Sequence, residues 1–244
     1  MIFFLNNIYN IYYTMISKVT LITGGSRGIG YNIVKSLLKK NHKIINISRK
    51  NCEINSKNIY NYNYDINDLD CDIVNNIIKN HNIGNCIINA GITKDTFFHK
   101  MTKNDWEDVI KTNFTSNYSI LNPIVNQMRN NKKGNIIFIS SVNAKKGALG
   151  QTNYSSSKSA MFGLTKSLAL ENSQKNILVN CICPGYINTD MTKKMKSKDL
   201  NNVIENIPLG KLGEEKDISE LVEFFINKNK YITGSIIDIN GGLI

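Results

Sequence analysis

The chain has 244 residues, of which 41% are hydrophobic, and its formal net charge is +11. This length and apolar content suffice for one large core, and no Pro-, Gly- or Ser-rich linker or internal repeat divides the chain. No apolar run reaches the roughly 20 residues that a membrane-spanning helix requires, so we expect no membrane partner. The five cysteines form no C-x-x-C pair and the three histidines are scattered. This pattern argues against a metal site and favours reduced thiols in a cytoplasmic protein.

The positive charge raises the question of nucleic-acid binding. The lysines are spread along the chain, however, with only short clusters such as Lys145-Lys146 and Lys193-Lys194. Asn, Ile and Lys are all over-used relative to average composition, and their codons are AT-rich, so genome base bias explains the charge more simply. We therefore expect no nucleic-acid partner, although a basic surface could attract a polyanionic substrate or an acidic carrier protein.

The segment from Met1 to Thr14 precedes the first expected strand. It has neither the basic start nor the small-residue cleavage site of a secretory signal. We expect a non-native or disordered extension, with the functional domain spanning residues 15–244. A membrane-surface or targeting segment is the alternative.

The rest of the chain alternates short apolar runs with helical patterns. Strands are expected at Lys18–Thr23, Lys43–Ser48, Ile59–Tyr64, Cys86–Asn89, Asn135–Ser140, Ile177–Cys183 and Ser235–Ile239. Helices are expected after Gly28 and at Leu69–Lys79, Trp106–Met128 (with Pro123 an irregularity), Gln151–Glu171 and Asp217–Asn227. This alternation predicts an α/β fold, a single-domain Rossmann-type doubly wound parallel sheet of about seven strands with helices on both faces. Ligands of such sheets bind beyond the carboxyl ends of the strands.

A glycine-rich turn, TGGSRGIG, joins the first expected strand to the first helix. Glycines let backbone amides approach a pyrophosphate closely, and the helix N-terminus adds partial positive charge. The spacing is G-x-x-x-G-x-G and differs from the more common dinucleotide fingerprint. The candidate cofactor-binding residues in this turn are Gly24, Ser26, Arg27, Gly28, Ile29 and Gly30.

The end of the second expected strand indicates which nicotinamide cofactor is used. A carboxylate there would bind the ribose 2′-hydroxyl, whereas an arginine accommodates a 2′-phosphate. The chain has Ser48-Arg49-Lys50 at this place, and Arg27 adds a second cation. The sequence therefore predicts NADPH/NADP+ as cofactor. Asp65, just after the third strand, is a candidate acceptor for the adenine amine or, alternatively, a cap of the strand end.

Tyr154 and Lys158 are four residues apart on an expected helix, so their side chains share one face. A free tyrosine titrates near pH ~10 and is a poor proton donor at neutral pH. A cation about 4 Å away at an effective dielectric near 20 is worth roughly 4 kcal/mol, which predicts a lowered pKa for Tyr154. This pattern predicts that Tyr154 is a general acid and that Lys158 lowers its pKa. The alternative is that the two residues are an ordinary pair on the surface of a helix.

These motifs, in this order along residues 15–244, resemble the short-chain dehydrogenase/reductase family. The motifs are TGGSRGIG, Asn89-Ala90-Gly91, Asn113, Ser141, Tyr154-x-x-x-Lys158 and Pro184-Gly185. The resemblance implies that Tyr154 donates a proton to the substrate carbonyl, that Ser141 hydrogen-bonds that oxygen, and that Lys158 holds the nicotinamide ribose. It implies that Asn113 binds, through its helix backbone, a water linked to Lys158.

The resemblance also completes the set of cofactor-binding candidates. The additions to the glycine-rich turn are Arg49, Asp65, Ile66, Asn89, Ala90, Gly91, Tyr154, Lys158, Pro184, Gly185, Ile187 and Thr189. None of these roles requires a metal ion, because hydride transfer needs only a proton donor and a positioned carbonyl.

Two branches of the family are similar to this chain, the acetoacetyl-CoA reductases of polyhydroxybutyrate synthesis and the 3-oxoacyl-[acyl-carrier-protein] reductases of fatty-acid synthesis. The first branch implies substrate contacts by Asp95, Ser141, Leu149, Gln151, Tyr154 and Tyr186. Leu149 stands where that branch carries Phe, and Tyr231-Ile-Thr-Gly234 leans toward the second branch. The implied activity is NADPH-dependent reduction of a short 3-oxoacyl thioester by a homotetramer, with acetoacetyl-CoA as the favoured substrate and the carrier-protein thioester of fatty-acid synthesis as the alternative. A non-catalytic nucleotide-binding protein is the alternative of another class.

Overall fold

The computed structural model of the protein describes residues 19–190, 192 and 197–244. The expected extension Met1 to Thr14 lies outside the described residues. Seven parallel strands form one sheet in the order β3-β2-β1-β4-β5-β6-β7. The strands are β1 (Val19–Thr23), β2 (Lys43–Ser48), β3 (Ile59–Asn63), β4 (Asn85–Ile88), β5 (Gly134–Ile139), β6 (Ile177–Pro184) and β7 (Ile236–Ile239). The predicted fold class is confirmed.

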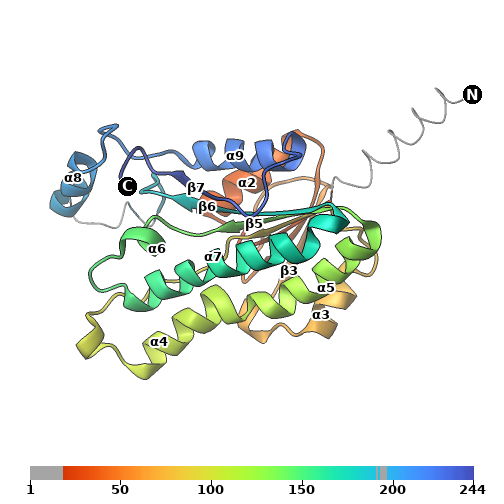
Figure 1. Cartoon of the computed structure of the whole chain (residues 1–244), viewed down its shortest axis with the longest axis horizontal. Coiled ribbons are helices and arrows are strands. Elements are labelled where there is room, and N and C mark those ends of the chain that lie inside the picture. The colour runs from red at the N-terminus through yellow and green to blue at the C-terminus, as the bar shows by residue number, and fades with distance from the viewer. Residues whose placement is uncertain (1–18, 191, 193–196) are drawn as a thin grey trace, which may run out of the picture.

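Helices cover both faces of the sheet (Figure 1). The α-helices are α2 (Gly28–Lys39), α3 (Cys71–Ile78), α4 (Lys103–Ile110), α5 (Asn117–Asn131), α6 (Asn143–Lys146), α7 (Thr152–Asn172), α8 (Ser197–Glu205) and α9 (Glu215–Asn227). Three 3₁₀ turns, η1 (Ile66–Asp68), η2 (Phe98–Lys100) and η4 (Ser173–Lys175), and one π-helix, η3 (Lys111–Thr115), complete the described elements. Among the residues described, no helix combines the length and apolar character needed to cross a membrane.

The alternation of side chains along each strand separates the core into two layers. On β4, Cys86 and Ile88 pack with α3, α5 and α7, whereas Ile87 packs with α2 and α9. Both layers are fully buried, with Phe138 in the first and Phe225 in the second. Burial on both faces explains why the strands read as nearly continuous Ile-, Val- and Leu-rich runs rather than as alternating patterns.

The prediction of one continuous helix over Trp106–Met128 is wrong, because the helical segment is interrupted and extends beyond these bounds. The chain forms α4, then the π-helix η3, then α5, and Pro123 lies inside α5 without ending it. Proline removes one helical hydrogen bond, but Ile120, Ile124 and Met128 bury the apolar face of α5 on both sides of it. The irregular turn is therefore at Lys111–Thr115, where no proline or glycine marks it.

Candidate active site

The predicted site residues gather at one edge of the sheet, because parallel strands bring their carboxyl ends together. The glycine-rich turn follows β1, Asn89 follows β4, Ser141 follows β5, and Pro184 ends β6. The register aligns Ile139 of β5 with Ile182 of β6, so the loops after these two strands start at the same level. The edge faces the N-terminal half of α7, which carries Tyr154 and Lys158.

The glycine-rich turn brings two stretches of backbone into direct contact. Gly24 has a positive φ of 70° and donates its N–H to the Ile47 carbonyl at 2.9 Å. A Cβ at Gly30 would lie 2.2 Å from the Gly24 carbonyl oxygen, so no side chain fits there. Arg27 occupies the N-cap of α2 and, having no acceptor atom, cannot cap the helix. The first N–H groups of α2 therefore point toward the turn, an arrangement that binds anionic groups such as a pyrophosphate.

The predicted residue Asn89 and two side chains that sequence analysis did not select, Thr23 and Asn46, hold this turn in place. Thr23 Oγ1 accepts hydrogen bonds from the backbone N–H groups of Asn89, at 3.0 Å, and Ala90, at 3.1 Å. Asn89 Nδ2 donates to the Gly24 carbonyl at 3.0 Å. On the other side, the buried Asn46 accepts from the Gly25 N–H at 2.9 Å. A polar residue inside the otherwise apolar β2 was the signal that could have identified Asn46.

At the end of β2, the side chain of Arg49 is 65% exposed and lies 3.9 Å from the Asp65 carboxylate. Asp65 also accepts from the Asn67 N–H at 3.0 Å and so caps the start of η1, rather than the strand end that the sequence offered as its alternative role. The Ile66 side chain is buried in the α3–α5–α7 layer of the core, so only its backbone remains for a ligand. Arg27 is exposed on the neighbouring turn. Two cations thus flank this end of the site.

Ser141, Tyr154 and Lys158 come together at the centre of the edge. A hydrogen bond joins the Ser141 and Tyr154 side chains. Lys158 is buried, and its Nζ donates to the Ile139 carbonyl at 2.9 Å and lies 6.0 Å from the centre of the Tyr154 ring. A Cβ at Gly91 would be 3.3 Å from Lys158 Nζ, so the glycine leaves room for the ammonium. The geometry pairs a phenol and a hydroxyl above a buried cation.

The electrostatics differ from the expectation that Lys158 lowers the pKa of Tyr154. Burial raises the Tyr154 pKa, the Ser141 hydrogen bond opposes this, and the Asp95 carboxylate adds to the rise. Lys158 itself is desolvated, which lowers its pKa to about 8. The sequence argument compared only the two charges and omitted the cost of burying each one. The expected direction for Tyr154 is therefore wrong in this structure. Lys158 loses its charge as the pH rises through about 8.

Asn113 lies in the π-helix η3 and is fully buried. Its Nδ2 donates to the Ile92 carbonyl at 3.0 Å and to Ser157 Oγ at 2.9 Å, and its Oδ1 accepts from the Ile92 N–H at 2.8 Å. Its side chain thus ties the loop after β4 to α7. The Asn113 carbonyl accepts from Asn117 Nδ2 at 3.0 Å. Asn117 thus uses one lone pair of the backbone carbonyl that was expected to bind a water, and π-helical turns are frequent at functional sites.

The expected substrate residues form a polar chain beside Tyr154. Gln151 Nε2 donates to Asp95 Oδ2 at 2.8 Å, and Asn143 Nδ2 donates to Gln151 Oε1 at 2.9 Å. Asn143 Oδ1 is buried without a hydrogen-bond partner among the residues that the structure describes. Leu149, in contrast, is 89% exposed. Asn143 was not among the predicted site residues, although it fixes Gln151.

The loop after β6 closes the other side of the site. The Pro184 carbonyl accepts from the Val142 N–H at 2.8 Å, which joins this loop to the segment after Ser141. Ile187 is buried, and Thr189 donates its N–H to Thr192 Oγ1 at 2.9 Å. The ring of Tyr186 lies 5.6 Å from Lys146 Nζ, and burial raises its pKa. Residues Asp95 and Tyr186 thus come from opposite loops toward the same edge.

Comparison with known proteins agrees with this architecture. The family model described as short chain dehydrogenase matches residues 18–200. The acetoacetyl-CoA reductase of Rhizobium meliloti (strain 1021) is 40% identical over 236 residues, covering 93% of this chain and 98% of the relative. The 3-oxoacyl-[acyl-carrier-protein] reductase FabG of Buchnera aphidicola subsp. Acyrthosiphon pisum is 36% identical over 236 residues, covering 93% and 97%. A solved structure of ElxO with NADP bound aligns with a TM-score of 0.86 at 30% identity, covering 93% and 98%.

The fold and the site define an oxidoreductase built on a dinucleotide-binding sheet. The chain belongs to the short-chain dehydrogenase family. The resemblance stated from the sequence motifs is confirmed.

We predict that Gly30→Ala abolishes measurable NADPH binding, because the added methyl group would meet the Gly24 carbonyl at 2.2 Å and displace the turn. Gly163→Ala is the matched control, since a Cβ there meets nothing within 4 Å. Isothermal titration calorimetry with NADPH measures both variants, and circular dichroism checks that they are folded. Wild-type affinity in a folded Gly30→Ala protein would contradict the assignment of this turn to the cofactor.

Proposed function

We propose that the protein reduces short 3-oxoacyl thioesters with NADPH, and that acetoacetyl-CoA is its substrate. The observation that carries this proposal is the hydrogen-bonded Ser141–Tyr154 pair beside the buried Lys158 ammonium, at the edge where the glycine-rich turn ends. The relatives named acetoacetyl-CoA reductase and 3-oxoacyl-[acyl-carrier-protein] reductase support 3-oxoacyl thioesters as the substrate class.

The residues suit the two halves of a carbonyl reduction. When bound, NADPH supplies a hydride. The Tyr154 hydroxyl delivers the proton that the substrate oxygen gains, and Ser141 donates a hydrogen bond that stabilises the negative charge developing on that oxygen. A raised Tyr154 pKa keeps the phenol protonated, which a proton donor requires. The Lys158 ammonium, next to Gly91, lies where it can hold the ribose hydroxyls.

The described residues fit the dinucleotide. Gly30 packs so closely on the Gly24 carbonyl that a Cβ would not fit between them. The resulting turn forms a backbone cradle, and the N-terminus of α2 faces it. Arg49 and Arg27 are exposed cations at the far end of the cradle, which suits a 2′-phosphate rather than a free 2′-hydroxyl. Asn89, Ala90 and Gly91 would line the middle of the cofactor, and Pro184 to Thr189 would cover the nicotinamide.

The substrate would enter between the loop of Asp95 and the loop of Tyr186. Gln151 is held by Asp95 and Asn143, so its position is fixed before a thioester arrives. Leu149 lies at the mouth with an exposed apolar side chain, which suits contact with a pantetheine arm. This arm is common to coenzyme A and to acyl-carrier protein. Reduction of the carrier-protein thioester in fatty-acid synthesis is therefore the second candidate function.

A non-catalytic nucleotide-binding protein is a third candidate, from another class. The joint presence of a buried ammonium, a hydrogen-bonded phenol and a π-helix disfavours it, because burial of a charge and an irregular helix both cost stability. A cytoplasmic location belongs to the proposal and is supported by the five cysteines, none of which forms a disulfide.

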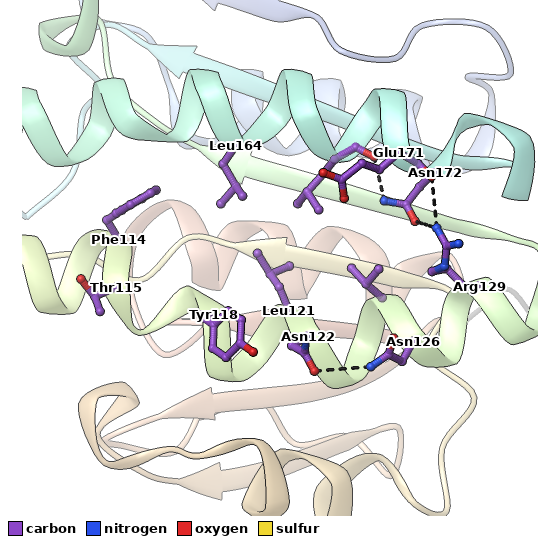
Figure 2. Close-up of a pocket in the computed structure, with 12 residues that line it drawn as sticks. Phe114, Thr115, Tyr118, Leu121, Asn122, Asn126, Arg129, Leu164, Glu171 and Asn172 are labelled. Carbon is purple, nitrogen blue, oxygen red and sulfur yellow. Dashed lines mark hydrogen bonds between the residues drawn. The ribbon is translucent and has the colours of Figure 1, made fainter.

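The proposal includes a homotetramer, and a groove between α5 and α7 supports it (Figure 2). The groove encloses about 780 Å³ and is lined by apolar residues such as Leu121, Leu164 and Leu168. Met161 and Ala169 of α7 face the core, so α7 carries apolar side chains on two sides. At one end of the groove, Arg129 donates to the Glu171 carbonyl at 3.1 Å and to Asn172 Oδ1 at 2.8 Å, so the apolar middle of the groove is the part that a second copy of the chain would cover.

We predict that Tyr154→Phe lowers kcat/KM at least about a hundredfold while NADPH affinity changes little, because only the proton donor is removed. Stopped-flow oxidation of NADPH and calorimetry measure the two effects. Tyr231→Phe is the control, since Tyr231 is 97% exposed. Retention of more than about a tenth of the wild-type rate, a difference of ~1.4 kcal/mol, would exclude Tyr154 as the acid.

Whether the acyl group is carried by coenzyme A or by acyl-carrier protein is tested by measuring reduction of acetoacetyl-CoA and of acetoacetyl-carrier protein side by side. We expect kcat/KM for the coenzyme A thioester to equal or exceed that for the protein-bound one. Lys103→Glu, a change at the exposed start of α4, should have little effect, because coenzyme A is too small to contact the protein surface away from the site. A preference of about a hundredfold for the protein-bound thioester that high salt abolishes would instead identify a fatty-acid synthesis enzyme.

We predict that the protein elutes with about four times the mass of one chain in size-exclusion chromatography with light scattering. Tyr118→Glu should yield smaller species, because it places a charge at the groove, where Tyr118 is 68% exposed. Tyr231→Glu, also on an exposed tyrosine, should leave the mass unchanged. A monomeric wild-type protein would contradict the assembly.

A further inference from the structure

A line of three hydrogen-bonded side chains joins three elements beside Tyr154. Gln151 Nε2 donates to Asp95 Oδ2 at 2.8 Å, and Asn143 Nδ2 donates to Gln151 Oε1 at 2.9 Å. Asp95 lies on the exposed loop after β4, Gln151 is the N-cap residue of α7, and Asn143 begins α6. Asn143 is buried, with 8% of its surface exposed. The line therefore runs from the interior of the protein to the substrate entrance.

The direction of the hydrogen bonds in this line is fixed by its outer end. An ionised carboxylate can only accept hydrogen bonds, so Gln151 must turn its Nε2 group toward Asp95. The Gln151 oxygen then faces Asn143, which must offer its Nδ2 group. Turning the Asn143 amide round would place two acceptor oxygens against each other. The observed order is therefore the one in which every contact has a donor and an acceptor.

This order leaves one atom of Asn143 without a partner. Asn143 Oδ1 is buried, and so is the Ser155 hydroxyl one helical turn beyond Gln151; neither has a hydrogen-bond partner among the residues that the structure describes. Ser159, a further turn along α7, donates to the Ala144 carbonyl, so α6 lies along this face of α7. An unpartnered buried acceptor costs stability. Packing alone would favour an apolar side chain in place of Asn143, so the amide points to a role in the site.

The order of the line makes Gln151 a hydrogen-bond donor toward a ligand. A primary amide nitrogen carries two hydrogens, and Gln151 Nε2 donates to one acceptor, Asp95, in the described part of the chain. The second hydrogen remains for a ligand. Tyr154 follows Gln151 by three residues at the start of α7, so their side chains are neighbours, with Cβ atoms about 5–6 Å apart.

The backbone of Asn143 acts on the catalytic pair in the same sense. Its N–H donates to Ser141 Oγ at 3.2 Å. This contact occupies one lone pair of the hydroxyl and leaves the hydroxyl hydrogen to be donated to another acceptor. Asn143 thus contacts two donors, Ser141 through its backbone and Gln151 through its side chain.

A 3-oxoacyl thioester carries two carbonyl oxygens, and in the proposed function Ser141 and Tyr154 bind the ketone oxygen that is reduced. We propose that Gln151 donates to the second, thioester oxygen, and that Asn143 is the positioning residue that keeps Gln151 turned as a donor. This inference rests on the proposed function, since it assigns a contact to the second carbonyl of that substrate. A simple ketone lacks this oxygen, so the contact favours 3-oxoacyl compounds over simple ketones.

The first test needs no turnover. The glutamines of the chain are Gln127, Gln151 and Gln174, so selective nitrogen-15 labelling of glutamine gives a simple side-chain amide spectrum, in which Gln151→Ala assigns the signals of interest. A hydrogen bonded to a carboxylate is displaced downfield, and we expect this for one Gln151 hydrogen in the wild type. In Asn143→Leu the amide loses its inner anchor, so that hydrogen should return toward the position of a solvated amide.

Gln127 is the internal control, because it donates to the His81 carbonyl at 2.9 Å and should keep its signals. A wild-type spectrum without a downfield Gln151 hydrogen overturns the proposal. So does a downfield hydrogen that persists unchanged in Asn143→Leu, because Asn143 would then not be needed to orient the amide.

The second test separates KM from kcat. A contact made equally in the ground state and the transition state raises KM when it is lost and leaves kcat nearly unchanged. We expect Asn143→Leu to raise KM for acetoacetyl-CoA at least about tenfold, with NADPH affinity unchanged. Asn180→Leu is the matched control, because Asn180 is also buried and binds the Ile232 carbonyl and the Ser235 N–H. It should lower Tm without changing KM. A wild-type KM in Asn143→Leu overturns the proposal.

Asn143→Asp covers the case in which leucine impairs folding. It keeps the size of the side chain and replaces the donor with an acceptor, so Gln151 would lie between two carboxylates and lose one of its two contacts. KM should rise as in Asn143→Leu, and circular dichroism checks that the variant is folded. A folded Asn143→Asp protein with a wild-type KM contradicts the proposal. If the wild-type protein reduces no thioester, the proposed function fails, while the amide spectrum still decides whether Asn143 orients Gln151.

Discussion

The parallel direction of all seven strands is the constraint on which the site depends. Because every carboxyl end lies at one edge, the glycine-rich turn after β1, the loop after β4 and Ser141 after β5 meet without any strand having to reverse. The crossover helices are thereby placed on the two faces, and α7 lies over β5 and β6, so Tyr154 and Lys158 reach the same edge. The sheet topology thus determines which residues can meet at the site, and the individual contacts then fix their positions.

Buried asparagines convert this topology into fixed geometry. Asn46 holds the glycine-rich turn, Asn113 joins the loop after β4 to α7, and Asn153 binds the carbonyls of Lys94 and Asp105. An amide offers both donors and acceptors, so each of these side chains can join two backbone segments that no strand pairing connects. A buried amide is stable only when it is hydrogen-bonded. These residues therefore specify one arrangement of the loops, because a shifted loop would leave an amide unpaired.

Much of the fold could be read from the sequence, and the reason is physical. Strands buried on both faces appear as β-branched runs, and β2 was predicted with its observed ends at Lys43 and Ser48. The π-helix at Lys111–Thr115 was not predicted, because its residues give no local signal and the wide turn depends on the contacts of Asn113 with distant segments. Helix α6 was missed because four residues carry few periodic positions, and α8 was missed because most of its residues are polar and none is buried, so it presents no broad apolar face.

The residues of the site also fall into those that the sequence could predict and those that it could not. Residue types with a required chemistry, such as Tyr154 and Lys158, could be selected from spacing, whereas Asn46, Thr23 and Asn143 act through positions that only the folded chain shows. The direction of the Tyr154 pKa was mistaken for a related reason. Charges can be counted along a sequence, but desolvation depends on how deeply a side chain is enclosed, which burial in the fold determines.

The two outer strands of the sheet have a consequence for solubility. A sheet with open edges offers unpaired N–H and C=O groups to other chains, and long exposed edges promote aggregation. Here the edge strands are short, with five residues in β3 and four in β7. β7 also carries Asp238, whose ion pair with Lys145 places charge on that edge. Short length and charge together oppose edge-to-edge pairing, so removing the Asp238 carboxylate would weaken a protection against self-association as well as an ion pair.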